Sequence, residues 1–213
     1  MIGEELIRWT GWDLRSGANA DPSAALEFGR SAPGDPGVDG HYDLLAVAAR
    51  GFRPPQLLSV TNTGQVGSSA DRTEPERSGL RQTWSLLYRP VSATAPATVA
   101  PFAVYLLGVD PPAGATDDEL VEFNEFYTNV HLPEVAERRN ALRASRFELV
   151  EAIRSPYKGP PRYLAAYEVD EKSAANRRHS GPPYSSGPDV WQRHRTPWRL
   201  WYRRLDPNSP TEP

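Results

Sequence analysis

The sequence predicts an α+β protein made of two similar units in one chain, 1–90 and 101–206. Trp84–Arg89 and Trp198–Arg203 share Trp, Leu, Tyr and Arg at the same offsets, which indicates an internal repeat. Between the two halves, 90–101 carries three prolines and no charged residue. This composition is typical of an extended linker, so we place the boundary between the units there.

Two further segments recur in the same order in both halves. Ile7–Leu14 resembles Leu142–Leu149, with an aromatic residue, an acid and a leucine in register, and His41–Val47 resembles Arg162–Glu168. On this alignment the first unit begins at the second strand of the repeat. We therefore expect it to be degenerate, with its opening strand and helix replaced by a segment around 21–29. Strands favour these residue types in any case, so the alternative that short aromatic strands resemble one another without repetition stays open.

The second unit opens with an apolar run, Phe102–Val109, which has the length and the residues of a buried strand. Thr116 followed by Glu119 forms a capping-box pattern that predicts the start of a helix. Apolar residues at helical spacing continue from there, at Leu120, Phe123, Tyr127 and Val130. Pro133 is expected to kink this helix or to open a second helical segment, because proline lacks an N–H and crowds the preceding turn.

Strands are then expected around Phe147 and Tyr163, followed by a short helix near 189–193 and a last strand at Trp198–Leu205. The order strand, helix, strand, strand, helix, strand is that of the ferredoxin-like plait. The sequence thus predicts two ferredoxin-like units, the first of them degenerate, packed sheet against sheet as a pseudo-dimeric α+β barrel. Such a barrel would enclose an apolar cavity for a small ligand.

Composition narrows the chemistry. The chain has 213 residues, 38% of them hydrophobic, with no cysteine, four histidines and a net charge of −3. Disulfides and thiolate chemistry are excluded, and a His131–Glu134 pair is too sparse for a metal site, so we expect neither a metal nor a cofactor. Arginines and aromatic residues interleave over 191–204, but the overall acidity argues against nucleic acid.

No apolar segment has the length of a membrane span, and the first residues are acidic, so we expect a cytoplasmic protein. The expected partner is a small molecule, and pairing into a homodimer stays open.

The segment Glu122–Glu134 is the most informative part of the chain. Tyr127 and His131 lie one helical turn apart and share a face. His131 suits general acid–base catalysis, because an imidazole with a pKa near 6.5 accepts and donates protons around neutral pH. Tyr127 could orient His131 or stabilise an oxyanion, and Asn129 could bind a substrate carbonyl. The alternatives are a helix-capping histidine, a core tyrosine and an asparagine that serves the local backbone.

This segment resembles the first-helix motif of EthD-like proteins in the dimeric α+β barrel superfamily. The resemblance covers about Phe102–Leu205 and includes the strand Pro161–Val169 and the approach Thr196-Pro197-Trp198. It implies a cofactor-independent enzyme of aromatic or polyketide metabolism, such as a cyclase, an isomerase or a dehydratase. The chain departs from the motif at Thr128-Asn129, where similar proteins often carry an acid.

The leading hypothesis is therefore His131-mediated proton transfer on an aromatic or polyketide-like carbonyl substrate, assisted by Tyr127. Aromatic residues expected to line the substrate cavity, together with Asn129, are Tyr105, Tyr163, Tyr167 and Trp198. Two alternatives remain: a non-catalytic protein that binds a small ligand, and a haem-binding protein with an axial histidine.

Overall fold

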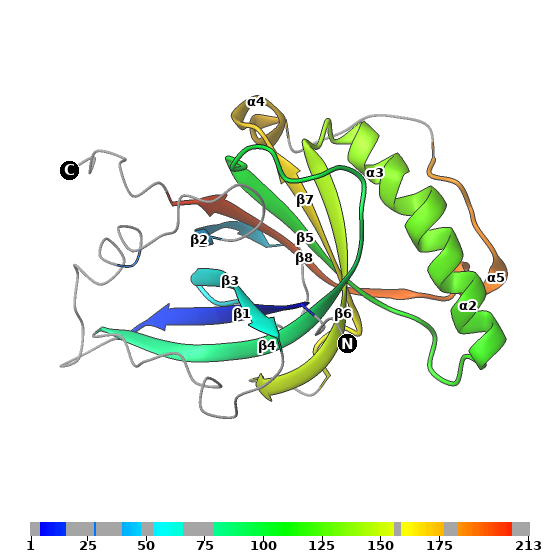
Figure 1. Cartoon of the computed structure of the whole chain (residues 1–213), viewed down its shortest axis with the longest axis horizontal. Helices are drawn as coiled ribbons and strands as arrows, with labels where there is room; N and C mark the ends of the chain where they lie inside the picture. Colours follow the sequence, from blue (N-terminus) through cyan, green and yellow to red (C-terminus); the bar gives the residue numbers. More distant parts are fainter. Residues whose placement is uncertain are drawn as a thin grey trace.

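The computed structural model describes residues 5–15, 28, 40–47, 53–65, 79–155, 159–176 and 183–205. Eight strands form a closed barrel in the order β1-β3-β2-β8-β5-β7-β6-β4 (Figure 1), and all eight pairings are antiparallel. This sheet-rich fold with few helices is consistent with the predicted α+β class. The strands are β1 (Glu5–Leu14), β2 (Gly40–Val47), β3 (Leu57–Gln65), β4 (Leu80–Ala93), β5 (Ala103–Asp110), β6 (Arg143–Arg154), β7 (Tyr163–Val169) and β8 (Arg195–Arg204).

The two halves of the chain contribute four neighbouring strands each. The first half has the spatial order β4-β1-β3-β2 and the second half has β8-β5-β7-β6. Two seams join them, one between β2 and β8 and one between β4 and β6. The same relative order therefore occurs twice, and each half completes the barrel for the other.

The repeat alignment from the sequence is wrong for two of its three segments. In the order of strands, β1 takes the place of β5 and not of β6, and β2 takes the place of β6 and not of β7. The first half consequently has its own opening strand, and β3, which the sequence analysis missed, supplies its third. Only the match of Trp84 with Trp198 joins equivalent strands. The other two matches arose because short aromatic strands resemble one another whatever their place in a sheet. The expected replacement around 21–29 lies outside the described residues, except for Phe28.

The linker begins later than the prolines suggested. Strand β4 continues through Pro90 to Ala93 and pairs with β6 as far as Ser145. The register of this pairing shifts just after Pro90, which is exposed. Proline is tolerated in a strand at such an irregularity because no ladder hydrogen bond needs its missing N–H.

The helix after Thr116 starts where the sequence predicts, but its buried residues do not keep the predicted helical spacing throughout. Helix α2 (Asp117–Phe126) begins with the capping box: Thr116 Oγ1 accepts from the Glu119 N–H, and the Glu119 carboxylate accepts from the Thr116 N–H. One π-helical turn, η3 (Tyr127–His131), leads directly into α3 (Leu132–Arg138), with Pro133 in its first turn. Short helices α4 (Glu171–Ala175) and α5 (Asp189–Gln192) follow later.

The π turn explains one misplaced residue. Val130, expected in the buried stripe, is exposed, and Leu132 is buried in its stead. A π turn uses i→i+5 hydrogen bonds, and the Leu132 N–H indeed donates to the Tyr127 carbonyl. The wider turn moves the next buried position five residues beyond Tyr127 instead of three.

Apolar side chains fill two layers. Alternate residues of the strands point into the barrel, where both halves contribute, for example Trp9, Tyr88, Leu106 and Tyr202. The other face of β5 and β7 is covered by α2, η3, α3 and α5, which lie together on one side of the barrel (Figure 1). Eight-stranded barrels have an interior that their own side chains can fill, and large buried side chains of both halves pack together in the described interior.

Matched contacts cross the barrel interior. Trp84 and Trp198 stack with ring centroids 4.7 Å apart. The Tyr88 hydroxyl donates to the Pro161 carbonyl, and the Tyr202 hydroxyl donates to the Pro55 carbonyl, both at 2.9 Å. Each hydroxyl thus satisfies a carbonyl of the other half.

Glycines make room for these contacts. A Cβ at Gly11 would lie 2.5 Å from the Pro55 side chain, and a Cβ at Gly108 would lie 2.6 Å from the Pro161 side chain. Both separations are shorter than real Cβ contacts, so glycine is required at both positions.

Among the described helices, none has both the length and the apolar character needed to cross a membrane.

We expect Tyr88→Phe and Tyr202→Phe to destabilise the protein by similar amounts, about 1 to 2 kcal/mol each. Each change removes one buried donor and leaves a proline carbonyl without its partner. Urea unfolding of both variants and of the unchanged protein measures this. Losses below about 0.5 kcal/mol in both variants, or a large effect in only one, would contradict the matched roles.

Candidate functional site

The expected site residues separate into three places. Tyr105, Tyr127, Tyr163 and Tyr167 meet between the helices and the outer face of β5 and β7, and we call these four residues the tyrosine layer. Trp198 points the opposite way, into the barrel interior. Asn129 is exposed on η3. The structure therefore brings the four tyrosines together and leaves Trp198 and Asn129 apart from them.

Strand alternation and the helix position the tyrosine layer. Tyr105 lies opposite Tyr167 in the pairing of β5 with β7, and their rings are 6.0 Å apart. Tyr127 approaches from η3 and packs against Trp191 of α5 at 5.0 Å. The ring of Tyr163 stacks against Phe123 of α2.

Two hydroxyls of the tyrosine layer are buried without a partner among the described atoms, those of Tyr127 and Tyr167. Burial raises the pKa of both phenols, so they stay protonated. Tyr127 and Tyr105 are among the groups that further raise the pKa of Tyr167. Native proteins pair nearly all buried polar groups, so unpaired hydroxyls in one place indicate a site where a ligand or water completes the pairing.

Arg146 is a buried cation that sequence reasoning missed. The Arg146 side chain has no exposed surface. Its guanidinium lies 4.4 Å from the Tyr127 ring centroid and 4.3 Å from the Tyr163 ring centroid. Its Nη1 donates to Thr128 Oγ1 at 2.8 Å and its Nη2 to Asn124 Oδ1. Desolvation lowers its pKa.

No carboxylate pairs with Arg146 in the described part of the chain. Ala144 and Arg146 are two residues apart on β6, so both side chains point to the same face of the sheet. This spacing does not single out an arginine as buried, because strand arginines usually face solvent.

His131 ends η3 in an aromatic setting. Its ring is half-buried, 4.6 Å from Trp191, 5.4 Å from Tyr184 and 5.8 Å from Tyr127 between centroids. Its Nδ1 is buried without a hydrogen-bond partner among the described atoms. Desolvation, with a smaller contribution from His194, lowers the pKa of His131 to about 4. The imidazole is therefore neutral at pH 7, and the helix continues past it into α3, so it does not cap a helix C-terminus.

The segment 183–188 lies against α3 near His131. Ser185 donates to the Glu134 carboxylate, and Arg138 donates to the Pro183 carbonyl at 2.8 Å. The Arg138 guanidinium also lies 4.0 Å from the Tyr184 ring centroid. These contacts hold the Tyr184 ring at the outer edge of the tyrosine layer.

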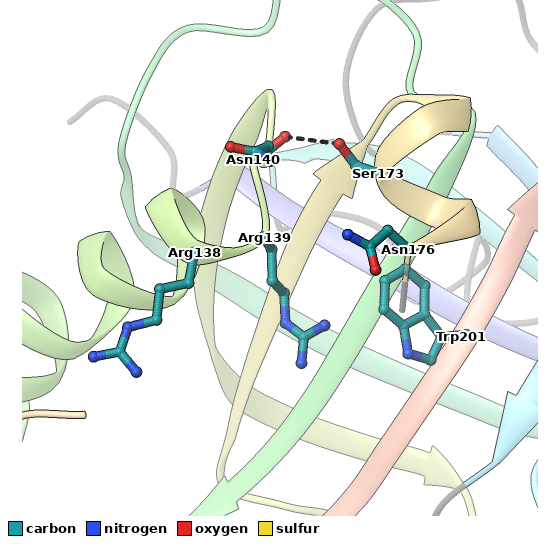
Figure 2. Close-up of a pocket in the computed structure, with 6 residues that line it drawn as sticks. All are labelled: Arg138, Arg139, Asn140, Ser173, Asn176 and Trp201. Atoms are coloured by element: carbon teal, nitrogen blue, oxygen red, sulfur yellow. Dashed lines mark hydrogen bonds between the residues drawn. The ribbon is translucent and has the colours of Figure 1, made fainter. Parts of the chain in front are cut away.

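A small cavity of about 30 Å³ lies at the other end of α3. It is lined by Arg138, Arg139, Asn140, Ser173, Asn176 and Trp201 (Figure 2). The Arg139 guanidinium lies 3.8 Å from the Tyr105 ring centroid, so this cavity borders the tyrosine layer. No pattern in the sequence predicted that these residues lie together, because they come from separate segments of the chain.

Within the described residues, no three His, Asp or Glu side chains come together as metal ligands. No protein-family model, no curated protein and no solved structure matches the chain. The fold and the site thus define an antiparallel barrel protein with a buried layer of phenols and guanidinium groups beside a neutral histidine.

We expect His131 to make stability depend on pH. The pKa is about 4 in the folded protein and about 6.5 in the unfolded chain. Below pH 6.5 the unfolded chain binds a proton that the folded protein does not bind, so stability is complete above pH 6.5 and falls as the pH falls towards 4. The contribution lost over this window is on the order of 2 kcal/mol.

The measurement is urea unfolding at pH 7.5 and pH 4.5 for the unchanged protein and for His131→Gln. The variant lacks the imidazole, so it should lose less stability on acidification, while the carboxylates common to both proteins cancel. Equal losses in the two proteins would show that His131 titrates normally in the fold.

Proposed function

We propose that the protein is a cofactor-independent enzyme in which His131 transfers a proton on an aromatic or polyketide-like carbonyl substrate. Cyclisation, isomerisation and dehydration all fit this chemistry. The observation that carries the proposal is the pair of buried, unpaired hydroxyls of Tyr127 and Tyr167 beside a neutral histidine. A substrate carbonyl that accepted hydrogen bonds from these phenols would satisfy both of them.

The state of His131 suits the first step of such a reaction. A neutral imidazole has a lone pair that can accept a proton, and desolvation keeps His131 neutral at physiological pH. A base with a pKa near 4 is weak, so it matches a carbon acid that neighbouring carbonyl groups have already activated. The phenols would then stabilise the enolate oxygen as charge develops, and the imidazolium would return the proton.

Arg146 and Trp191 would position Tyr127. The guanidinium binds Thr128 and Asn124 on either side of Tyr127 and lies against the phenol ring. Trp191 packs against both Tyr127 and His131. The phenol and the imidazole are thus held by shared neighbours, as preorganised groups of an active site are.

The fold supports a second part of the proposal, that the chain contains two ferredoxin-like units related to EthD-like proteins. The relative strand order is the same in the two halves. The contacts of Gly11 with Pro55 and Trp84 are matched by those of Gly108 with Pro161 and Trp198. Matched contacts on equivalent strands favour a tandem arrangement over chance similarity of strands.

A non-catalytic ligand-binding protein is the second candidate function. It is favoured by the aromatic walls around His131, which leave its Nδ1 buried. In such a protein the tyrosine layer would bind a carbonyl compound without proton transfer.

Proton exchange on an activated carbon separates the two functions. In D₂O, the protein should accelerate loss of the central C–H signal of benzoylacetone, an aryl 1,3-diketone, in proton NMR. His131→Ala should lower this acceleration by about two to four orders of magnitude, the usual scale for losing a general acid or base. Tyr127→Phe should cost less, because it removes one hydrogen bond to the oxygen and leaves the base in place.

His194→Ala is the control, since the His194 ring also packs against Trp191 but is not assigned to the reaction. It should change the exchange rate by less than about threefold. Melting temperatures of all variants show whether each one folds. A folded His131→Ala protein with an unchanged exchange rate would exclude the catalytic assignment, and ligand binding without exchange would favour the second candidate.

A further inference from the structure

The cavity at the C-terminal end of α3 has the size and charge of a site for one small anion. Its volume is about 30 Å³, whereas a single water needs roughly 10 to 15 Å³ of such space, so it holds a group of two or three non-hydrogen atoms. The lining residues include two guanidinium groups and no acid. A carboxylate matches both properties.

Arg139 is the cation available to a ligand. Its guanidinium lies on the Tyr105 ring at 3.8 Å and near the Trp201 ring at 5.4 Å. Its Nε is buried without a hydrogen-bond partner, and the side chain makes no ion pair with any described residue. A stacked guanidinium keeps its N–H donors in its own plane, where a planar carboxylate accepts two of them.

Arg138 is already engaged. It donates to the Pro183 carbonyl and lies over the Tyr184 ring, and Figure 2 shows its head turned away from Trp201. Arg139, by contrast, extends from the end of α3 towards Asn176 and Trp201 (Figure 2). The negative end of the α3 dipole accounts for a preference for basic residues here, but not for a guanidinium stacked on a tyrosine with its Nε unpaired.

The rest of the lining suits an aromatic carboxylic acid. Trp201 is almost fully buried and gives the cavity an apolar, planar wall. Asn140, Ser173 and Asn176 add only neutral polar groups, so the site holds one unpaired positive charge. A planar monoanion fits this balance better than a dianion, which would need more donors.

We propose that Arg139 binds the carboxylate of a planar aromatic acid, with Tyr105 and Trp201 as the walls beside it. The inference rests on the proposed function, to which it adds that the substrate is a carboxylic acid. His131 and Arg139 stand at the two ends of α3, roughly 12 Å apart at 1.5 Å per residue. An acid that engages both residues is therefore elongated, and a short acid occupies the Arg139 end alone.

Isothermal titration calorimetry with 2-naphthoate and its neutral analogue 2-naphthamide tests the site on the full chain. Naphthoate should bind at least about tenfold more tightly than naphthamide, because the charge-assisted pair is lost in the amide. Arg139→Gln should weaken naphthoate at least about tenfold and naphthamide less than about threefold. Arg138→Gln is the matched control and should change naphthoate affinity less than about threefold, because that side chain is held by Pro183 and Tyr184.

Three results would overturn the proposal: no binding of naphthoate at millimolar concentration, equal affinities for acid and amide, or unchanged naphthoate affinity in Arg139→Gln. Circular dichroism checks that the variant folds. If it does not, Arg139→Lys keeps the charge but not the planar fork, and an affinity equal to that of the unchanged protein would then refute the site. His131→Gln should keep naphthoate affinity, so failure of proton exchange and failure of carboxylate binding are separate outcomes.

Discussion

The stacking of Trp84 on Trp198 at the centre of the barrel is the contact on which the rest of the architecture depends. Two indoles fit face to face there because glycines on β1 and β5 leave room beside Pro55 and Pro161. The carbonyls of those prolines are then satisfied by tyrosine hydroxyls from the opposite half. Neither half can complete its own interior, since each lacks the donor that the other supplies. The tyrosine layer lies on the outer face of the sheet, under the helices, and the candidate site is there rather than beside the two indoles.

The layer between the helices and the sheet contains buried polar groups that reduce the stability of the fold and that the proposed reaction uses. A buried cation with only neutral hydrogen-bond partners and aromatic faces is expensive to desolvate, and removing its partners would be more so. Arg146 nevertheless fixes the helix where the π turn occurs, through Asn124 and Thr128. Unpaired phenols nearby add to the same cost. Proteins usually retain such arrangements at functional sites, where a bound molecule recovers part of the loss.

Elements that depend on residues adjacent in the sequence were predicted correctly, whereas features that depend on contacts between distant segments were not. The capping box at Thr116, the apolar strand after Phe102 and the strand around Tyr163 depend on neighbouring residues, and the structure has all three. The side of the sheet on which Tyr105 and Trp198 lie depends on the register of β5 with β7 and β8, which no single strand encodes. Arg146 is buried through its contacts with Asn124 of α2 and Thr128 of η3, and the π turn that exposes Val130 departs from the regular helical period. Such pairings are tertiary, so periodicity and composition could not have found them.

Barrel closure also has a consequence for how the chain folds. The seam between β2 and β8 joins residues that are far apart in the sequence, for example Asp43 and Arg203, which are 160 positions apart. Contacts of such high sequence separation form slowly, because a long loop must be closed before they give any stabilisation. During synthesis β2 leaves the ribosome long before β8, so until then it presents an unpaired edge to other chains. The nascent protein is therefore most prone to aggregation in the interval before β8 is made.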